Sequence, residues 1–226
     1  MSQNVVNSLL DIFAAPFAVF SRIKDKSLSA WVPLLIMVSL SAAVTTWYFL
    51  TIDLYQFMEV SMLMSGQEAS PEELNQILKA ESVIRVSSAA IGSLSSLVIY
   101  IILALYFFLI SLLVAENKTS YGQWLSVISW ASLPSLLSLL SIGVSYALIV
   151  PEFSLIQALD KTSISALLGL TWEDKYFNVL STATIGALWS YALYGIGFKV
   201  LTQCKPVTAV IVALVPVTIQ FGLMSL

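Results

Sequence analysis

Carboxylates are the main side chains in this sequence that could do acid–base or metal chemistry. Glu68, Glu72 and Glu73 stand close together in a polar segment. Paired carboxylates can transfer protons or hold a metal ion, but such sites usually add histidine, a cation or further ligands. The chain has no histidine, a single cysteine, and no glycine-rich phosphate loop or HExxH or GxSxG sequence. We therefore predict no catalytic site, no metal site and no bound cofactor, and expect the glutamates to be solvated at a helix start.

Serines at a regular spacing form the clearest pattern of polar side chains. They recur every three residues at Ser126, Ser129, Ser132, Ser135, Ser138 and Ser141. Each step of three lags the helical repeat by about 60°, so the hydroxyls wind around a helix rather than marking one face. Pro134 lies within the series and removes a backbone donor, which predicts a kink. The series is either a polar lining for a permeation path or packing between membrane helices, and we favour packing, centred on Ser132, Pro134 and Ser135.

The composition indicates that these residues lie in a membrane. Hydrophobic residues make up 58% of the chain and charged residues 10%, whereas a soluble domain carries about 25% charged residues. The net charge of −3 gives no broad basic surface, so we do not expect nucleic acid as a partner. The predicted fold class is all-α, a polytopic transmembrane helical bundle. Five uncharged segments reach the length of about 20 residues that a span needs; the predicted spans are 30–52, 86–115, 123–149, 176–201 and 207–225.

An amphipathic segment, residues 1–26, precedes the five-span domain predicted for residues 27–226. Its apolar residues recur at helical spacing, and Pro16 is expected to divide it into two short helices. Two placements are open. The segment is either an interfacial helix at the inner face of the membrane, with Arg22, Lys24 and Lys26 near lipid phosphates, or a cap packed on the bundle.

The distribution of lysine and arginine predicts the orientation. With five spans, one side holds Arg22, Lys24, Lys26, Lys118, Lys199 and Lys205, and the other holds Lys79, Arg85, Lys161 and Lys175. The excess of six over four places the N-terminus in the cytoplasm and the C-terminus outside. We therefore expect a multi-pass membrane protein whose two ends lie on opposite sides.

Polar segments between the spans carry helix-start patterns. Ser70-Pro71-Glu72-Glu73 has the order of a capping box, and Thr171 to Asp174 is similar. Asp160 and Lys161 are interpreted as loop charges. No charged side chain falls deep inside a predicted span, which argues against proton-coupled carriers, pumps and voltage sensors.

Small and aromatic residues are expected to shape the packing. Gly92 and Ser96 form a small-xxx-small pair, and Gly195 and Gly197 lie in the fourth span. Several aromatic residues near the predicted interfaces fit an aromatic belt: Trp31, Trp47, Tyr48, Trp124, Trp172 and Tyr176.

Short motifs in a fixed order resemble those of a known family. They are Phe13-Ala-Ala-Pro16-Phe17, Trp31-Val-Pro33, Lys118-Thr-Ser-Tyr121, Ser132-Leu-Pro134, Trp189 and Gly195-Ile-Gly197. Together with the span count, they resemble the bacterial branch of the Yip (Ypt/Rab-interacting protein) family of five-span membrane proteins. Eukaryotic members of this family look like adaptors that bind small GTPases and one another, so the resemblance implies an adaptor role, and its bacterial branch implies the bacterial inner membrane. The family's Asp-Leu-Tyr-Gly-Pro motif has only a partial counterpart, Asp53-Leu54-Tyr55-Gln56, after the first span, so small-GTPase binding is not expected.

The leading hypothesis is a non-enzymatic membrane protein that acts by helix-mediated assembly or as an adaptor. Its partners would be the lipid bilayer and copies of itself or other membrane proteins. The alternative is a small channel, permease or lipid-moving protein that uses the serine-rich third span. We expect structural or packing roles for Pro16, Trp31, Pro33, Gly92, Ser96, Ser132, Pro134, Ser135, Trp189, Gly195 and Gly197.

Overall fold

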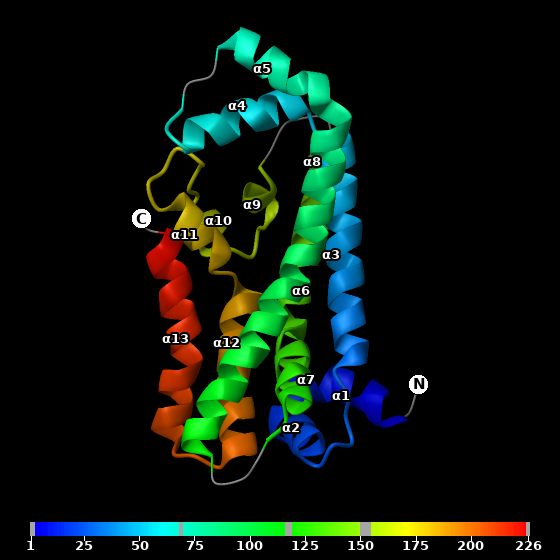
Figure 1. The fold of residues 1–226 in the computed structure, drawn as a ribbon, viewed down its shortest axis with the longest axis vertical. Helices are drawn as coiled ribbons and strands as arrows, with labels where there is room; N and C mark the ends of the chain where they lie inside the picture. Colours follow the sequence, from blue (N-terminus) through cyan, green and yellow to red (C-terminus); the bar gives the residue numbers. More distant parts are fainter. Residues whose placement is uncertain (1–2, 68–69, 116–118, 150–154, 225–226) are drawn as a thin grey trace. The chain divides into compact units, whose positions relative to one another are not determined.

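The computed structural model describes residues 3–67, 70–115, 119–149 and 155–224 (Figure 1). In these ranges all the regular structure is helical, apart from an isolated antiparallel bridge between Ser163 and Thr184. Contacts divide the chain into two compact units. The first unit comprises Met1–Met37, Leu97–Leu136 and Ile185–Leu226, and the second comprises Val38–Ser96 and Leu137–Thr184.

Four helical stretches are long and apolar enough to cross a membrane: Trp31–Thr51 (α3), Pro71–Val114, Tyr121–Leu148 and Pro206–Met224 (α13). The second comprises α5 (Pro71–Ile77), a short 3₁₀ turn η1 (Leu78–Ala80) and α6 (Glu81–Val114), and the third lies within α7 (Tyr121–Ala131), η2 (Leu133–Ser135) and α8 (Leu136–Ile149). These stretches confirm a helical membrane bundle.

The fourth predicted span is interrupted. Residues 176–201 were expected to form one helix, but α11 (Phe177–Thr182) ends before Ala183, and α12 runs from Ile185 to Thr202. With 18 residues, α12 is about 27 Å long, slightly less than the hydrocarbon core of about 30 Å. The count of five spans therefore stays a prediction.

Of the two helix-start patterns predicted in the polar segments, one caps a helix and the other does not. The box at Ser70 is confirmed, because the Ser70 hydroxyl accepts a hydrogen bond from the Glu73 amide and the Glu73 carboxylate accepts one from the Ser70 amide. The second box is wrong as a helix start. Thr171 bonds to the Asp174 carboxylate, but turns follow, and the next helix begins at Phe177.

Aromatic rings fill the core of the first unit. The rings of Phe107 and Trp124 stack with their centroids 5.9 Å apart, and Phe198 lies 5.4 Å from Trp124. The Trp124 indole donates to the Thr119 hydroxyl at 2.9 Å. Trp124 is fully buried, so its predicted place in an interfacial belt is wrong, and the same holds for Tyr48 in the second unit.

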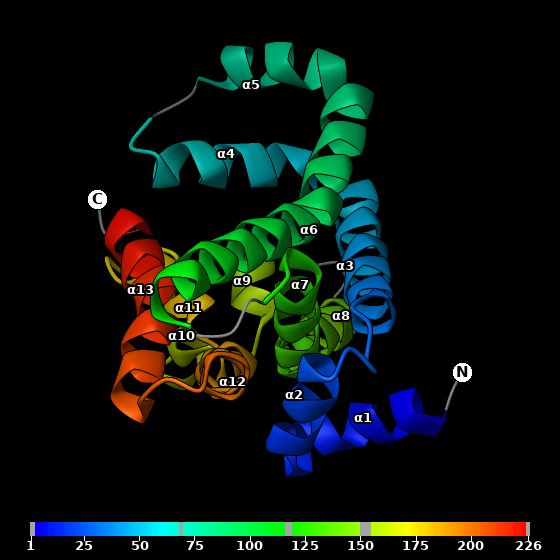
Figure 2. The ribbon, with the colours of Figure 1, turned by 60° about the horizontal axis from the view of Figure 1, so that its bottom comes forward.

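The N-terminal segment forms two helices, as Pro16 predicts: α1 (Gln3–Ala14) and α2 (Pro16–Lys24). Helix α2 packs on α7 and α12, and Val19, Phe20 and Ile23 are fully buried. These contacts support the cap, and residues 1–26 are part of the first unit. Figure 2 shows α1 folded back beside α2.

The opposite side of this helix pair remains apolar and exposed. Leu10 is 73% exposed and Phe13 51%. An ion pair joins the two helices, where Arg22 Nη1 contacts Asp11 at 2.7 Å and donates to the Ser8 hydroxyl at 2.8 Å. One face of the segment therefore packs on the protein, and another is available to lipid.

Short helices make up much of the second unit. The sequence did not predict α4 (Leu54–Met64), which lies beside α5. Two single-turn helices, α9 (Ile156–Leu159) and α10 (Ile164–Leu167), contact α11.

Candidate functional site

The kink at Pro134 is the place where α12 comes closest to the serine-rich span. The prediction of a kink is confirmed, since the helix tightens into η2 there. A Cβ atom built on Gly186 would overlap the carbonyl oxygen of Pro134 and lie 2.9 Å from its carbonyl carbon and 3.0 Å from the Cα of Ser135. Backbone cannot rotate away as a side chain can, so this approach requires glycine.

Serine hydroxyls of the first unit are bonded within the chain. The Ser132 hydroxyl donates to the Ile128 carbonyl and pairs with the Tyr194 hydroxyl, each at 2.8 Å. The hydroxyls of Ser135 and Ser190 lie 3.2 Å apart. Ser126 and Ser129 bond to carbonyls of their own helix. The bonds of Ser132 and Ser135 hold the kinked span against α12 and support the packing interpretation.

Small residues allow other close contacts of helices. A Cβ on Gly197 would lie 2.6 Å from Val127 and 3.3 Å from Phe20, which explains why α12 can approach both α7 and α2. Gly195 is in ordinary contact range of Ala213 on α13. In the second unit, Gly92 faces Thr45 at 3.4 Å.

Ser96, the partner of Gly92 in the small-xxx-small pair, differs from the other serines. Its hydroxyl is the one buried side-chain oxygen or nitrogen without a hydrogen-bond partner in the described ranges.

The remaining predicted packing residues divide into inner and outer positions. Pro33 is buried in the first turn of α3, and Pro16 is half-buried at the start of α2. Trp31 and Trp189, in contrast, are 66% and 44% exposed. Both indoles face the surroundings of the chain, so any role they have in packing involves lipid or another protein.

A polar cluster in the second unit centres on Asp160, which is only 4% exposed. Its Oδ1 accepts hydrogen bonds from the Thr162 amide at 2.9 Å and the Thr162 hydroxyl at 2.7 Å. Ser163, fully buried, donates to the Asp160 carbonyl and bonds to the Ser165 hydroxyl. Asp160 lies in the loop after α9, as expected, but it is buried rather than solvated, whereas Lys161 is exposed.

The serine-rich span and the break before α12 both reach this cluster. The Ser138 hydroxyl donates to the Thr184 hydroxyl at 2.9 Å and lies 3.3 Å from that of Thr162. The Ser141 hydroxyl accepts from the Lys161 amide at 2.9 Å. The Ile164 amide donates to the Ala183 carbonyl. The interruption between α11 and α12 therefore supplies backbone and hydroxyl groups to the cluster.

Carboxylate and hydroxyl oxygens together could bind a proton or a small cation. Burying a carboxylate is costly unless it is well hydrogen-bonded, and in the described ranges no lysine or arginine forms an ion pair with Asp160. The same ranges contain no group of three metal-ligating side chains. The cluster is thus a buried polar site of the second unit, and its hydrogen bonds hold the short α9 and α10 segment in place.

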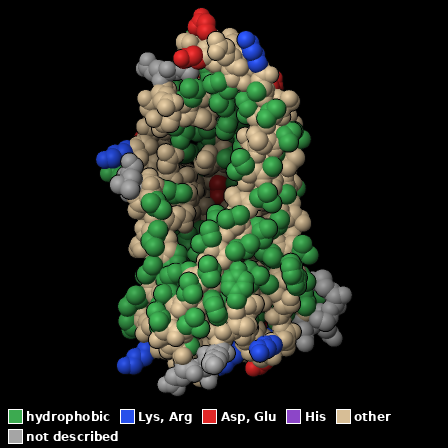
Figure 3. Space-filling model, viewed as in Figure 1, with side chains coloured by type: hydrophobic (Ala, Val, Ile, Leu, Met, Phe, Trp, Pro, Cys, Tyr) green, Lys and Arg blue, Asp and Glu red, His purple; other side chains and the backbone are tan. Residues whose placement is uncertain are grey.

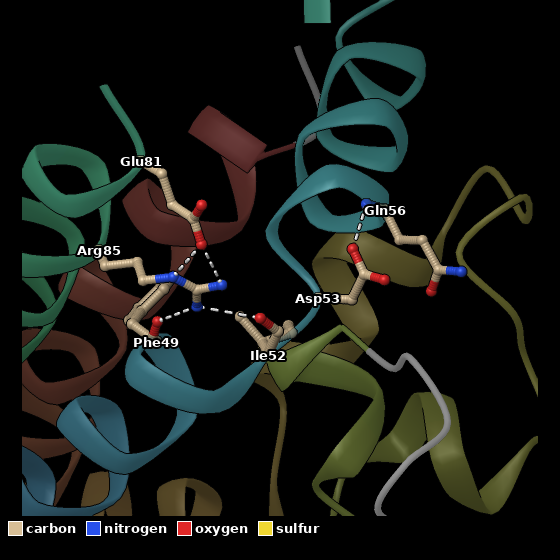
Figure 4. A network of polar contacts seen from close by, with 6 residues as sticks. All are labelled: Phe49, Ile52, Asp53, Gln56, Glu81 and Arg85. Atoms are coloured by element: carbon tan, nitrogen blue, oxygen red, sulfur yellow. Dashed lines mark hydrogen bonds and ion pairs between the residues drawn. The ribbon is translucent and has the colours of Figure 1, made fainter. Parts of the chain in front are cut away.

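A second polar network joins α3 to α6 (Figure 4). Arg85 Nη1 donates to the carbonyls of Phe49 and Ile52 at 2.8 and 3.0 Å, and its other nitrogens bond to Glu81. A helix leaves its last carbonyls unpaired, and a cation there is favourable. Glu81 and Arg85 stand four residues apart in the sequence, a spacing that favours an ion pair on a helix, but the sequence does not show that Arg85 caps α3.

The partial counterpart of the family motif lies next to this network. Asp53 accepts a hydrogen bond from the Gln56 amide at 3.1 Å and so caps the start of α4. In this chain the Asp53-Leu54-Tyr55-Gln56 run is a helix start.

Gln123 is a linking residue that the sequence analysis missed. Its Oε1 accepts from the Ser120 amide, which completes a capping box, and its Nε2 donates to the Lys24 carbonyl at 3.0 Å. One buried amide thus ties the start of α7 to the end of α2. Serine three residues before glutamine was a visible signal for the box, but not for the contact with α2.

Comparison with protein families matches the Yip1 domain to residues 10–226. No curated protein and no solved structure matches the chain.

Proposed function

This chain belongs to the Yip1 domain family, and from that premise we propose that it is a non-enzymatic membrane adaptor or organiser. It would act by assembling, through its helices, with copies of itself or with other membrane proteins. We further propose five spans, from the five uncharged segments, in a bacterial inner membrane, from the family resemblance. The distribution of lysine and arginine supports an N-terminus in the cytoplasm.

The observation that supports this proposal most is that the serine hydroxyls of the third predicted span form hydrogen bonds within the chain. The hydroxyls of Ser132 and Ser135 bond to α12, and those of Ser138 and Ser141 bond within the second unit. The side chains left outside on the long helices are mostly apolar, and Figure 3 shows many of them on the drawn face. Such a surface meets lipid or other helices rather than a polar substrate.

Helix α12 offers a defined outward stripe for such contacts. Ile185, Leu188 and Trp189 are 52%, 46% and 44% exposed, at positions that share one side of a helix. Tryptophan is enriched among the residues that dominate protein interfaces. This moves the proposed role of Trp189 from internal packing to external contact.

Crosslinking in native membranes, followed by purification and intact-mass measurement, tests the proposal. We expect one reproducible mass above that of a single chain, either a fixed oligomer or a complex with a named protein. A chain that stays monomeric and partnerless after crosslinking would contradict assembly.

The Asp160 cluster favours a second candidate function, a small channel, permease or lipid-moving protein. Ser138 brings the serine-rich span to a buried carboxylate, and buried ionisable groups in membrane proteins commonly serve transport. Solute flux and lipid scrambling in liposomes test this function, with Ser132→Leu and Ser135→Leu as variants. Activity that is present in the wild type and lost in both variants would support this function. No activity in the wild type, or activity that both variants retain, would exclude a path along these serines.

A further inference from the structure

A pocket of about 420 Å³ opens between α2 and the end of α12, within the first unit. Helix α2 contributes Phe17, Ser21 and Lys24 to its lining, and the end of α12 with the following turn contributes Lys199, Gln203 and Cys204. Of these residues, only Lys24 takes part in the contacts described above, and it does so through its backbone carbonyl rather than its side chain. The pocket therefore needs its own explanation.

The two lysines are half-buried cations that line one cavity. In the described ranges, ion pairs join Arg22 to Asp11 and Arg85 to Glu81, so neither Lys24 nor Lys199 has a carboxylate partner. Asp25 follows Lys24 but is exposed and forms no ion pair there. Each lysine lies in the last turn of its helix, a favourable place for one cation. That position does not explain why two cations share a pocket.

An anion between the lysines would offset both desolvation and mutual repulsion. Ser21 and Gln203 add a hydroxyl and an amide, which can donate hydrogen bonds to anionic oxygens. Gln203 adopts a φ of 58°, and its backbone amide closes the turn on the Lys199 carbonyl. The pocket thus combines positive charge with neutral donors, a combination that suits phosphate oxygens.

We propose that this pocket binds the phosphate group of an anionic ligand between Lys24 and Lys199. An anionic phospholipid and a free phosphorylated solute share this chemistry. The rim is apolar on the side of Phe17, which is 53% exposed and follows the exposed Leu10 and Phe13 in the N-terminal helices. A lipid could lay its acyl chain there, whereas a free phosphate would use only the polar part.

Cys204 provides a reporter, because it is the single cysteine of the chain and lines the pocket. The full chain in neutral detergent micelles is treated with a thiol-reactive maleimide while one ligand is titrated. The three probes are phosphatidylglycerol, phosphatidylcholine and inorganic phosphate. We expect phosphatidylglycerol to slow the labelling of Cys204 and phosphatidylcholine to leave it unchanged.

Charge-removing variants then test the two lysines. Lys24→Gln and Lys199→Gln should each weaken the protection about fivefold, since a lysine contributes about this factor at an anionic lipid surface. Lys79→Gln, an exposed lysine of the second unit, is the matched control and should leave the protection unchanged. Lys24→Arg keeps the charge and should retain most of the protection, which separates a binding defect from a folding defect.

The probes also separate the two sources of phosphate. Protection by phosphatidylglycerol that millimolar phosphate does not imitate assigns the site to a lipid headgroup. Protection by inorganic phosphate itself assigns it to a free phosphorylated solute. Equal labelling with all three probes, or protection that both lysine variants retain in full, would overturn the proposal.

Discussion

Replacing Gly186 with alanine is the most direct perturbation of the crossing between α12 and the kinked span. The added methyl group would overlap the Pro134 carbonyl oxygen and lie 2.9 Å from its carbon. The obstacle is backbone in a 3₁₀ turn, so α12 or η2 must move rather than a rotamer.

The size of the effect follows from two contributions. Overpacking a well-packed site costs about 1–3 kcal/mol. The shift also lengthens the bonds of Ser132 to Tyr194 and of Ser135 to Ser190, on either side of the crossing. Hydrogen bonds between membrane helices average about 0.6 kcal/mol. Together these predict a loss of about 2–4 kcal/mol in the free energy of unfolding.

Reversible unfolding in mixed micelles, as the fraction of denaturing detergent rises, measures this loss. Gly122→Ala is the control, because a Cβ there meets nothing within 4 Å. Gly122 is the second residue of α7, so this substitution should leave the stability unchanged or raise it by less than about 1 kcal/mol. If Gly186→Ala proves as stable as Gly122→Ala, the close crossing at Pro134 is refuted.

Three further predictions concern the polar networks. Arg85→Met should cost about 2–4 kcal/mol in the same unfolding assay, because two carbonyls lose a charged donor. Glu81→Gln should cost at most about 0.5 kcal/mol, since the Glu81 side chain is 52% exposed. Equal losses in the two variants would contradict the capping of α3 by Arg85. Asp160→Asn keeps an oxygen that accepts from the Thr162 amide and hydroxyl, so it should keep the fold. Asp160→Leu loses both hydrogen bonds and should lower the unfolding midpoint clearly. Identical midpoints would show that these bonds do not stabilise the fold. Gln123→Leu should lower the free energy of unfolding by about 2 kcal/mol, because it removes the cap of α7 and the hydrogen bond to the Lys24 carbonyl. It should also speed proteolysis between α2 and α3. An unchanged rate of cleavage would argue that the bond to Lys24 does not hold α2.

Features set by neighbouring residues were visible in the sequence. Pro16 and Pro134 interrupt their helices through local backbone effects, and the box at Ser70 needs only the residues up to Glu73. Long apolar segments likewise gave four helices that meet the requirements of a span.

Features set by distant contacts were not visible. The sequence does not show that the loop residue Asp160 is buried and bonded to Thr162, nor that Gly186 lies against the Pro134 backbone. Hydropathy also could not show the break at Ala183, because that residue is apolar and its carbonyl is used by Ile164. Trp124 and Trp189 carry the same side chain, yet one is buried and the other exposed.

Photo-crosslinking in living membranes tests the proposed assembly most directly. A photoreactive residue replaces Trp189, on the exposed stripe of α12, and a matched variant carries it at Phe198, which is fully buried on the same helix. We predict that position 189 yields one discrete protein adduct and that position 198 yields none between chains. Adducts with lipid alone at position 189, and equally at the exposed Trp31, would contradict assembly through this helix.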